Sequence, residues 1–184
     1  MDRKTRFEDL DPEKMIEEMR QEYWRGVTEA EEEVDEDTLQ VLVVELGLER
    51  FAIDASLCKT ITKMGHVTRV PKMPEYVLGV INLRGNIVSV VDMGLLLGIE
   101  KKQTAKSRLV VIESGDVRTA FLVDLVVGIE LVPVSRLEED AQTDTTLKDE
   151  YTKGHFAPAD GEEIWVTYLN MEKIIHGPEL TFNK

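Results

Sequence analysis

The chain has 184 residues, of which 42% are hydrophobic, and its formal net charge is −14. This length fits one domain with an extension, or two small subdomains, with enough apolar residues for a core. The negative charge disfavours nucleic acid and anionic membrane surfaces as partners, because both would repel the chain. Cys58 is the only cysteine, which excludes an intrachain disulfide and a cysteine-based zinc cluster.

The first 38 residues carry most of the excess charge, with 15 acidic and six basic side chains, and they lack strand patterning. Asp11 and Pro12 form a helix start, and Gly26 is a natural stop, which predicts a helix over about residues 12–25. Its narrow apolar stripe has two interpretations: it packs on its own domain, or it docks in the groove of a partner. The stripe consists of Met15, Ile16, Met19 and Tyr23. Acidic residues 29–37 follow as a linker.

From Leu39 onward the pattern changes to short, β-branched apolar runs separated by turn residues. The predicted strands cover residues 39–44, 51–53, 60–64, 77–81, 87–91, 108–113, 117–124, 125–132, 151–156 and 164–169. Brief helical turns are predicted after Asp54, Asp92 and Asn170, each of which can cap a helix. About ten strands at hairpin spacing predict an all-β sandwich or barrel pair. No internal repeat is obvious in the sequence.

The stretch from Tyr76 to Gly98 organises the chain as a hairpin followed by one short helix over residues 93–97. Its turn contains Arg84 beside Gly85, between two strands that we expect to be buried. A buried guanidinium needs partners for its five N–H donors, so this arginine is a candidate for a specific role rather than an ordinary surface cation.

The sequence offers no support for catalysis. The three histidines, His66, His155 and His176, lie in separate polar contexts without metal-ligand spacing, and we expect them at the surface. Asp54, Asp92 and Asp124 each fall at a strand end, where capping or turn bonding is the ordinary use. There is no phosphate-binding loop and no nucleophile elbow. We therefore expect neither enzyme activity, nor a metal, nor a cofactor.

The central stretch from Gly79 to Met93, GVINLRGNIVSVVDM, resembles the signature of CheW-type chemotaxis coupling domains, roughly G-x-x-N-L-R-G-x-I-x-P-V-x-D-L. Asn82, Leu83 and Asp92 are motif positions, and Asp124 belongs to a second matching element, V-D-x-V-x-x-I. The resemblance implies a domain over residues 39–177 followed by a tail, residues 178–184. It also implies two intertwined five-stranded, SH3-like barrels packed along a hydrophobic seam.

CheW-type proteins bridge the cytoplasmic tip of chemoreceptors and the regulatory domain of the CheA histidine kinase, so the resemblance implies a cytoplasmic adaptor at receptor arrays. The absence of an 18-residue apolar run and of a signal peptide also predicts a cytoplasmic protein without direct membrane insertion. The receptor tip lies as a helical hairpin in the seam. The groove residues implied by matched positions are Cys58, Ile61, Gly79, Arg84, Gly85 and Val110. Exposed apolar side chains on loops of the first barrel should contact the kinase.

Two positions depart from the family pattern. Thr60 stands where the family has a glutamate near the motif arginine, so Arg84 is left to bond backbone carbonyls or a partner's acid. Ser89 stands where the family has proline. Two other functions remain open: a detached regulatory module of a CheA-like kinase, and a β-barrel that binds a small ligand. The sensory pathway is open as well.

Overall fold

The computed structural model describes residues 37–99, 105–138, 147, 149–158 and 164–181. The chain separates into a short unit, Met1–Thr38, and a large unit, Leu39–Lys184. The helix predicted over residues 12–25 lies outside the described residues, as do its apolar positions Met15, Ile16, Met19 and Tyr23. The described residues therefore belong almost entirely to the large unit.

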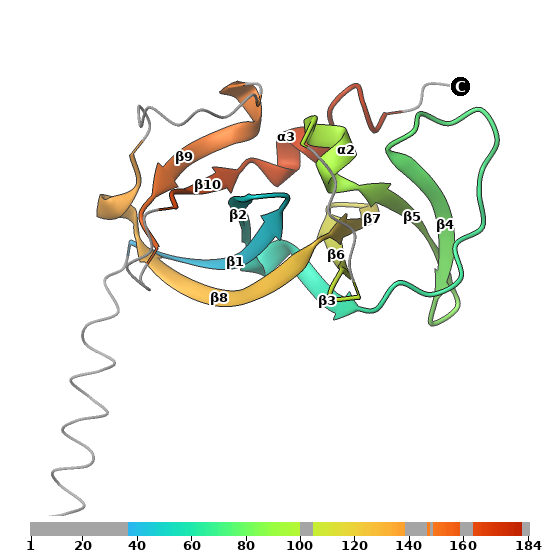
Figure 1. The fold of residues 1–184 in the computed structure, drawn as a ribbon, viewed down its shortest axis with the longest axis horizontal. Coiled ribbons are helices and arrows are strands. Elements are labelled where there is room, and N and C mark those ends of the chain that lie inside the picture. The colour runs from blue at the N-terminus through green and yellow to red at the C-terminus, as the bar shows by residue number, and fades with distance from the viewer. Residues whose placement is uncertain (1–36, 100–104, 139–146, 148, 159–163, 182–184) are drawn as a thin grey trace, which may run out of the picture. The chain divides into compact units, whose positions relative to one another are not determined.

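Two five-stranded sheets form this unit, which confirms the all-β prediction (Figure 1). Sheet A has the order β8-β1-β2-β10-β9, with β1 (Thr38–Leu46), β2 (Glu49–Asp54), β8 (Leu125–Pro133), β9 (Thr152–Phe156) and β10 (Val166–Leu169). Sheet B has the order β3-β6-β7-β5-β4, with β3 (Cys58–Thr62), β4 (Val77–Leu83), β5 (Asn86–Asp92), β6 (Arg108–Ser114) and β7 (Val117–Val123). The short helices are η1 (Ala55–Leu57), α2 (Met93–Leu97), η2 (Val134–Arg136), η3 (Asp149–Tyr151) and α3 (Met171–Ile175).

The two sheets share one plan, a repeat that the sequence does not reveal. Each contains a tight antiparallel hairpin, β1–β2 in sheet A and β6–β7 in sheet B. In sheet A, the second hairpin strand, β2, pairs in parallel with β10, which forms an antiparallel pair with β9. In sheet B, the second hairpin strand, β7, pairs in parallel with β5, which forms an antiparallel pair with β4. A one-turn helix follows each of these strands, α3 after β10 and α2 after β5.

The fifth strand of each sheet follows directly in the chain after the hairpin of the other sheet. The chain leaves β2 of sheet A through η1 and enters β3 of sheet B, and it leaves β7 of sheet B to enter β8 of sheet A (Figure 1). An aspartate stands at each crossing. Asp54 accepts a hydrogen bond from the Ser56 N–H, 2.9 Å long. Asp124 accepts one from the Gly47 N–H, 2.8 Å long, which ties the start of β8 to the β1–β2 turn.

We call β3 and β8 the exchanged strands. The segment that follows each exchanged strand forms a bridge to the strand at the opposite edge of the same sheet, and this bridge closes the sheet into a barrel. In sheet B, Thr68 and Val80 form an antiparallel bridge with N–O distances of 2.9 Å in both directions. In sheet A, Glu138 and His155 form the equivalent bridge, 2.8 Å in both directions. A glycine with positive φ lies beside each bridge, Gly79 in β4 and Gly154 in β9. These closures give the two barrels expected from the sequence.

Three hydrophobic clusters hold the unit together. One lies in the barrel of sheet A and contains Val41 and Phe156. Another lies in the barrel of sheet B and contains Leu109 and Leu122. The third is the largest and combines side chains of both sheets with both one-turn helices. This shared core includes Phe51 of sheet A and is the predicted seam. Because both sheets contribute to it, neither half buries its apolar surface alone.

The local signals for α2 act as predicted. Asp92 caps this helix by accepting a hydrogen bond from the Leu95 N–H at 3.1 Å, and Gly98 ends it in the left-handed conformation with φ 74°. The half-exposed strand predicted over residues 60–64 is observed earlier, as Cys58–Thr62. The shift arises because β3 begins directly after η1, where the chain has already crossed into sheet B.

Gly79→Ala in β4 should destabilise the fold more than Gly65→Ala in the segment that precedes β4. A β-carbon at Gly79 would lie 2.2 Å from the Thr68 carbonyl oxygen, and its φ of 140° suits only glycine. We expect a loss of about 2–5 kcal/mol in the free energy of unfolding, measured by urea denaturation. Gly65→Ala is the matched control, because nothing lies within 4 Å of the position that its β-carbon would occupy. Equal stability of the two variants would contradict the closure at Thr68.

His155 makes the fold sensitive to mild acid. This histidine is buried, contrary to the surface position expected from the sequence, and its Nδ1 lies 3.1 Å from the Thr167 hydroxyl. Burial lowers its pKa below the ordinary value of 6.5. The unfolded chain therefore binds a proton that the folded chain resists, so stability should fall as the pH drops below about 6.5. Thermal melting against pH should show this slope in the wild type and in His66→Gln, and a weaker slope in His155→Gln.

Candidate functional site

The β4–β5 hairpin turns through only two residues, Arg84 and Gly85, since Leu83 pairs with Asn86. Both turn residues have positive φ, 52° and 88°. Positive φ at both positions is typical of the type I′ turn, which usually has Asn-Gly rather than Arg-Gly. The Asn82 side-chain oxygen accepts a hydrogen bond from the Gly85 N–H at 2.8 Å and so fixes the turn. Three motif residues thus serve the geometry of one tight bend.

Arg84 is exposed at the tip of this hairpin, so the expectation that it lies between buried strands is wrong for its side chain. Its guanidinium makes no hydrogen bond or ion pair with the part of the chain that the structure describes. The alternative of bonding to local backbone carbonyls is therefore not realised among those residues. The left-handed backbone costs an ordinary residue about 1 kcal/mol. Arg84 therefore destabilises the turn by about this amount while its cation stays exposed.

The β3 residues of the predicted groove lie over the shared core. Cys58 pairs with Ile112 and Ile61 pairs with Val110 across the β3–β6 ladder. Cys58 is half-buried against the shared core, whereas Ile61 is 43% exposed. Val110 is fully buried, so its side chain packs in the core and gives no contact area to a groove. Ile61 is therefore an exposed apolar residue whose ladder partner, Val110, lies in the shared core.

Gly79 is also unavailable to a partner. It is buried, and the backbone of Thr68 occupies the space next to its α-carbon. The close approach that this glycine permits is therefore made within the chain. Of the six predicted groove residues, the exposed ones are Ile61, Arg84 and Gly85.

Sequence reasoning missed a row of exposed apolar side chains on β8. Val127, Ile129 and Leu131 are 45%, 64% and 62% exposed and alternate along the strand, so all three point to one face. On the opposite face, Val126 before the row packs on the shared core, and Val132 after it is buried in the core of sheet A. Because residues 125–132 are apolar almost throughout, their sequence gave no signal of which face is open. The two exchanged strands, β3 and β8, thus both carry exposed apolar residues.

The cysteine and the three aspartates singled out from the sequence occupy structural positions. Burial raises the pKa of the Cys58 thiol to about 11, with the Asp54 carboxylate adding to the rise and Lys59 opposing it. The thiol is therefore protonated at neutral pH and a poor nucleophile. Asp54, Asp92 and Asp124 accept backbone hydrogen bonds, as the sequence predicts. Within the described ranges no three His, Cys, Asp or Glu side chains are grouped to hold a metal ion.

The arrangement of these strands has counterparts among known proteins. The family model described as "CheW-like domain" matches residues 40–179. The chain belongs to the CheW-like domain family. The match covers both sheets and the exchanged strands.

CheW relatives match this chain over most of their own length. The "Chemotaxis protein CheW" of Thermotoga maritima is 32% identical over 136 residues, which is 74% of this chain and 87% of the relative. That of Helicobacter pylori is 30% identical over 147 residues, 79% of this chain and 87% of the relative. The CheW-like fold also matches the crystal structure of the scaffolding protein TtCheW from Thermoanaerobacter tengcongensis. That likeness has a TM-score of 0.68 and 22% identity, and it covers 77% of this chain and 90% of the other.

The named relatives of this CheW-like chain are chemotaxis proteins. No helix in the described part of the chain is long and apolar enough to cross a membrane.

Arg84→Asn should stabilise this CheW-like domain. Asparagine tolerates the left-handed conformation that arginine adopts here at φ 52°. We expect the free energy of unfolding to rise by about 0.5–1 kcal/mol, measured by urea denaturation. Arg84→Ala removes the same side chain without relieving the backbone, and it should leave stability nearly unchanged. If the asparagine and alanine variants were equally stable, the strain assigned to this turn would be absent.

Proposed function

We propose that this protein is a non-catalytic cytoplasmic adaptor that couples chemoreceptors to a CheA-type histidine kinase. The observation that carries the proposal is that both exchanged strands, β3 and β8, carry exposed apolar side chains. Ile61 on β3 and the row Val127, Ile129 and Leu131 on β8 are the exposed members. Apolar rows of this kind suit the apolar face of a partner helix.

The receptor tip is the proposed occupant of this surface. A helical hairpin presents apolar residues at spacings of three and four, which can contact alternate residues of β8 while a neighbouring turn contacts Ile61. Arg84 supplies a cation that is not neutralised by any described residue, so it is available to an acidic side chain on the flank of the helix. Thr60 in place of glutamate supports this assignment, because it leaves the arginine without the family's intrachain carboxylate.

A second surface suits the kinase. Leu48, in the β1–β2 turn, is 79% exposed, and Ile164 and Trp165, before β10, are 43% and 39% exposed. The parallel register pairs Val166 with Arg50, so the two residues before Val166 run beside the β1–β2 turn. This apolar end of sheet A fits the prediction that loops of the first barrel contact the kinase. Exposed tryptophan is frequent among residues that dominate binding energy.

Reconstitution separates the two surfaces. We expect Arg84→Glu and Ile129→Asp to weaken co-sedimentation with a receptor fragment by a factor of about 30 or more, equivalent to about 2 kcal/mol. Both variants should still bind the kinase regulatory domain. Leu48→Asp should show the opposite pattern, with receptor binding kept and kinase binding lost. Lys173→Glu, a charge reversal on the exposed face of α3, is the control and should affect neither.

The outcome also decides between the adaptor and the alternative functions. Kinase control by the receptor should fail in each of the three interface variants while their melting temperatures stay close to that of the wild type. Unchanged kinase activation by Arg84→Glu would reject the receptor surface. Binding of the wild type to the kinase without any binding to receptor would instead favour a detached regulatory module.

A further inference from the structure

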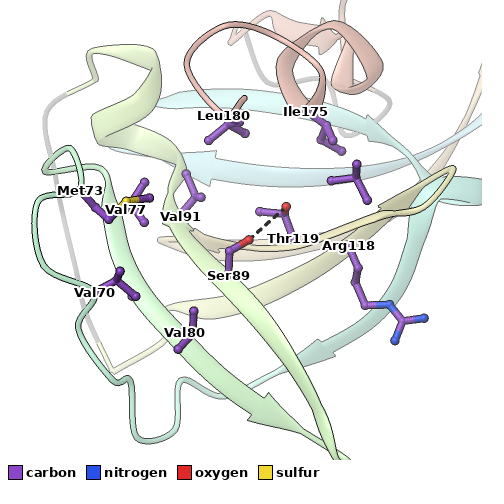
Figure 2. Close-up of a pocket in the computed structure, with 12 residues that line it drawn as sticks. Val70, Met73, Val77, Val80, Ser89, Val91, Arg118, Thr119, Ile175 and Leu180 are labelled. Carbon is purple, nitrogen blue, oxygen red and sulfur yellow. Dashed lines mark hydrogen bonds between the residues drawn. The ribbon is translucent and has the colours of Figure 1, made fainter. Parts of the chain in front are cut away.

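A cavity of about 190 Å³ lies between sheet B and the C-terminal segment, away from the exchanged strands (Figure 2). The segment between β3 and β4 forms one wall, strands β4, β5 and β7 form the floor, and Ile175 of α3 and Leu180 form the other wall. Its lining residues are Val70, Met73, Val77, Gly79, Val80, Ser89, Val91, Val117, Arg118, Thr119, Ile175 and Leu180. Nearly all of them present apolar groups, so the cavity favours an apolar occupant.

One polar point interrupts this apolar lining. The Ser89 hydroxyl on β5 donates a hydrogen bond to the Thr119 hydroxyl on β7, 3.3 Å away (Figure 2). Thr119 is only 4% exposed. Because its oxygen accepts from Ser89, its own proton remains to be donated, and no described residue receives it. The buried threonine can therefore donate a hydrogen bond to an oxygen atom of a ligand.

The charge beside the cavity is already compensated. Arg118 donates from Nε to Glu113 Oε2 at 2.7 Å, and its Nη2 forms an ion pair with the same carboxylate oxygen. The guanidinium extends away from the Ser89–Thr119 pair (Figure 2). With this cation paired and the chain at a net charge of −14, an anionic ligand gains little here. The site therefore favours a neutral molecule.

The size of the cavity limits the ligand further. An engineered apolar cavity of about 150 Å³ holds one benzene molecule, so this volume accommodates a single ring with one small substituent. We propose that the cavity binds small neutral aromatic molecules that carry one hydroxyl or carbonyl oxygen, with the ring among the valines and the oxygen at Thr119. Ser89 stands where the family signature has proline, so this hydroxyl pair is a feature of this chain.

Binding would join two parts of the fold. Ile175 and Leu180 belong to the C-terminal segment, whereas Val80 and Val91 belong to sheet B. A ligand between them adds apolar contact in the folded state that the unfolded chain cannot make, so it should raise the melting temperature as its concentration rises. This activity does not depend on receptor or kinase, so it can be tested on the full chain alone.

Methyl-resolved NMR titrations with phenol, toluene and benzoate provide the test. We expect saturable shifts at the methyl groups of Val80, Val91 and Ile175, with phenol binding several-fold more tightly than toluene and benzoate most weakly. Thr119→Val keeps the shape and removes the proton donor. This variant should lose the preference for phenol over toluene while it still binds toluene.

A blocking variant fixes the location. Val70→Trp places a large side chain at the 41% exposed wall of the cavity and should abolish the shifts. Val127→Trp, at a comparably exposed valine of β8 (45%), should leave them intact. Thermal melting of each variant without ligand confirms that it is folded. The proposal is overturned if phenol produces no saturable shifts at millimolar concentration, if Val70→Trp binds as the wild type does, or if Thr119→Val still prefers phenol.

Discussion

The exchange of one strand between the two sheets is the constraint on which the rest of this structure depends. β3 leaves the hairpin of sheet A to complete sheet B, and β8 leaves the hairpin of sheet B to complete sheet A. Each half therefore lacks an edge strand unless the other half is folded. The shared hydrophobic core, which includes Phe51 and Phe121, adds a second dependence, because both sheets bury apolar surface in it. We expect the two halves to fold as one cooperative unit for this reason.

The candidate interaction surface lies on the two exchanged strands. Alternate residues of β8 point to opposite faces, and Val126 and Val132 on one face pack in hydrophobic clusters. Val127, Ile129 and Leu131 therefore lie on the uncovered face of β8, and Ile61 is the exposed apolar residue of β3.

Glycine and polar side chains at the bends hold this frame in place rather than taking part in chemistry. Gly79 allows β4 to meet the Thr68 backbone, and Asn82 fixes the turn that presents Arg84. Asp124 ties the start of β8 to the β1–β2 turn through the Gly47 N–H. The family motif therefore mainly fixes the backbone conformation of the hairpin, and it places one exposed cation, Arg84, at the tip.

The sequence by itself determined most of the strands, the caps at Asp54, Asp92 and Asn170, and a turn within residues 82–86, because these depend on residues close together in the chain. The motif residues also carried the family. Only the tertiary structure decided which strands share a sheet, that Val110 and His155 are buried, and that alternate residues of β8 are open. Those facts depend on which distant segment covers each face, and a uniformly apolar strand such as residues 125–132 does not encode that locally. The cavity at Ser89 and Thr119 is of the same kind, since the segment between β3 and β4, three strands of sheet B and the C-terminal segment must meet to form it.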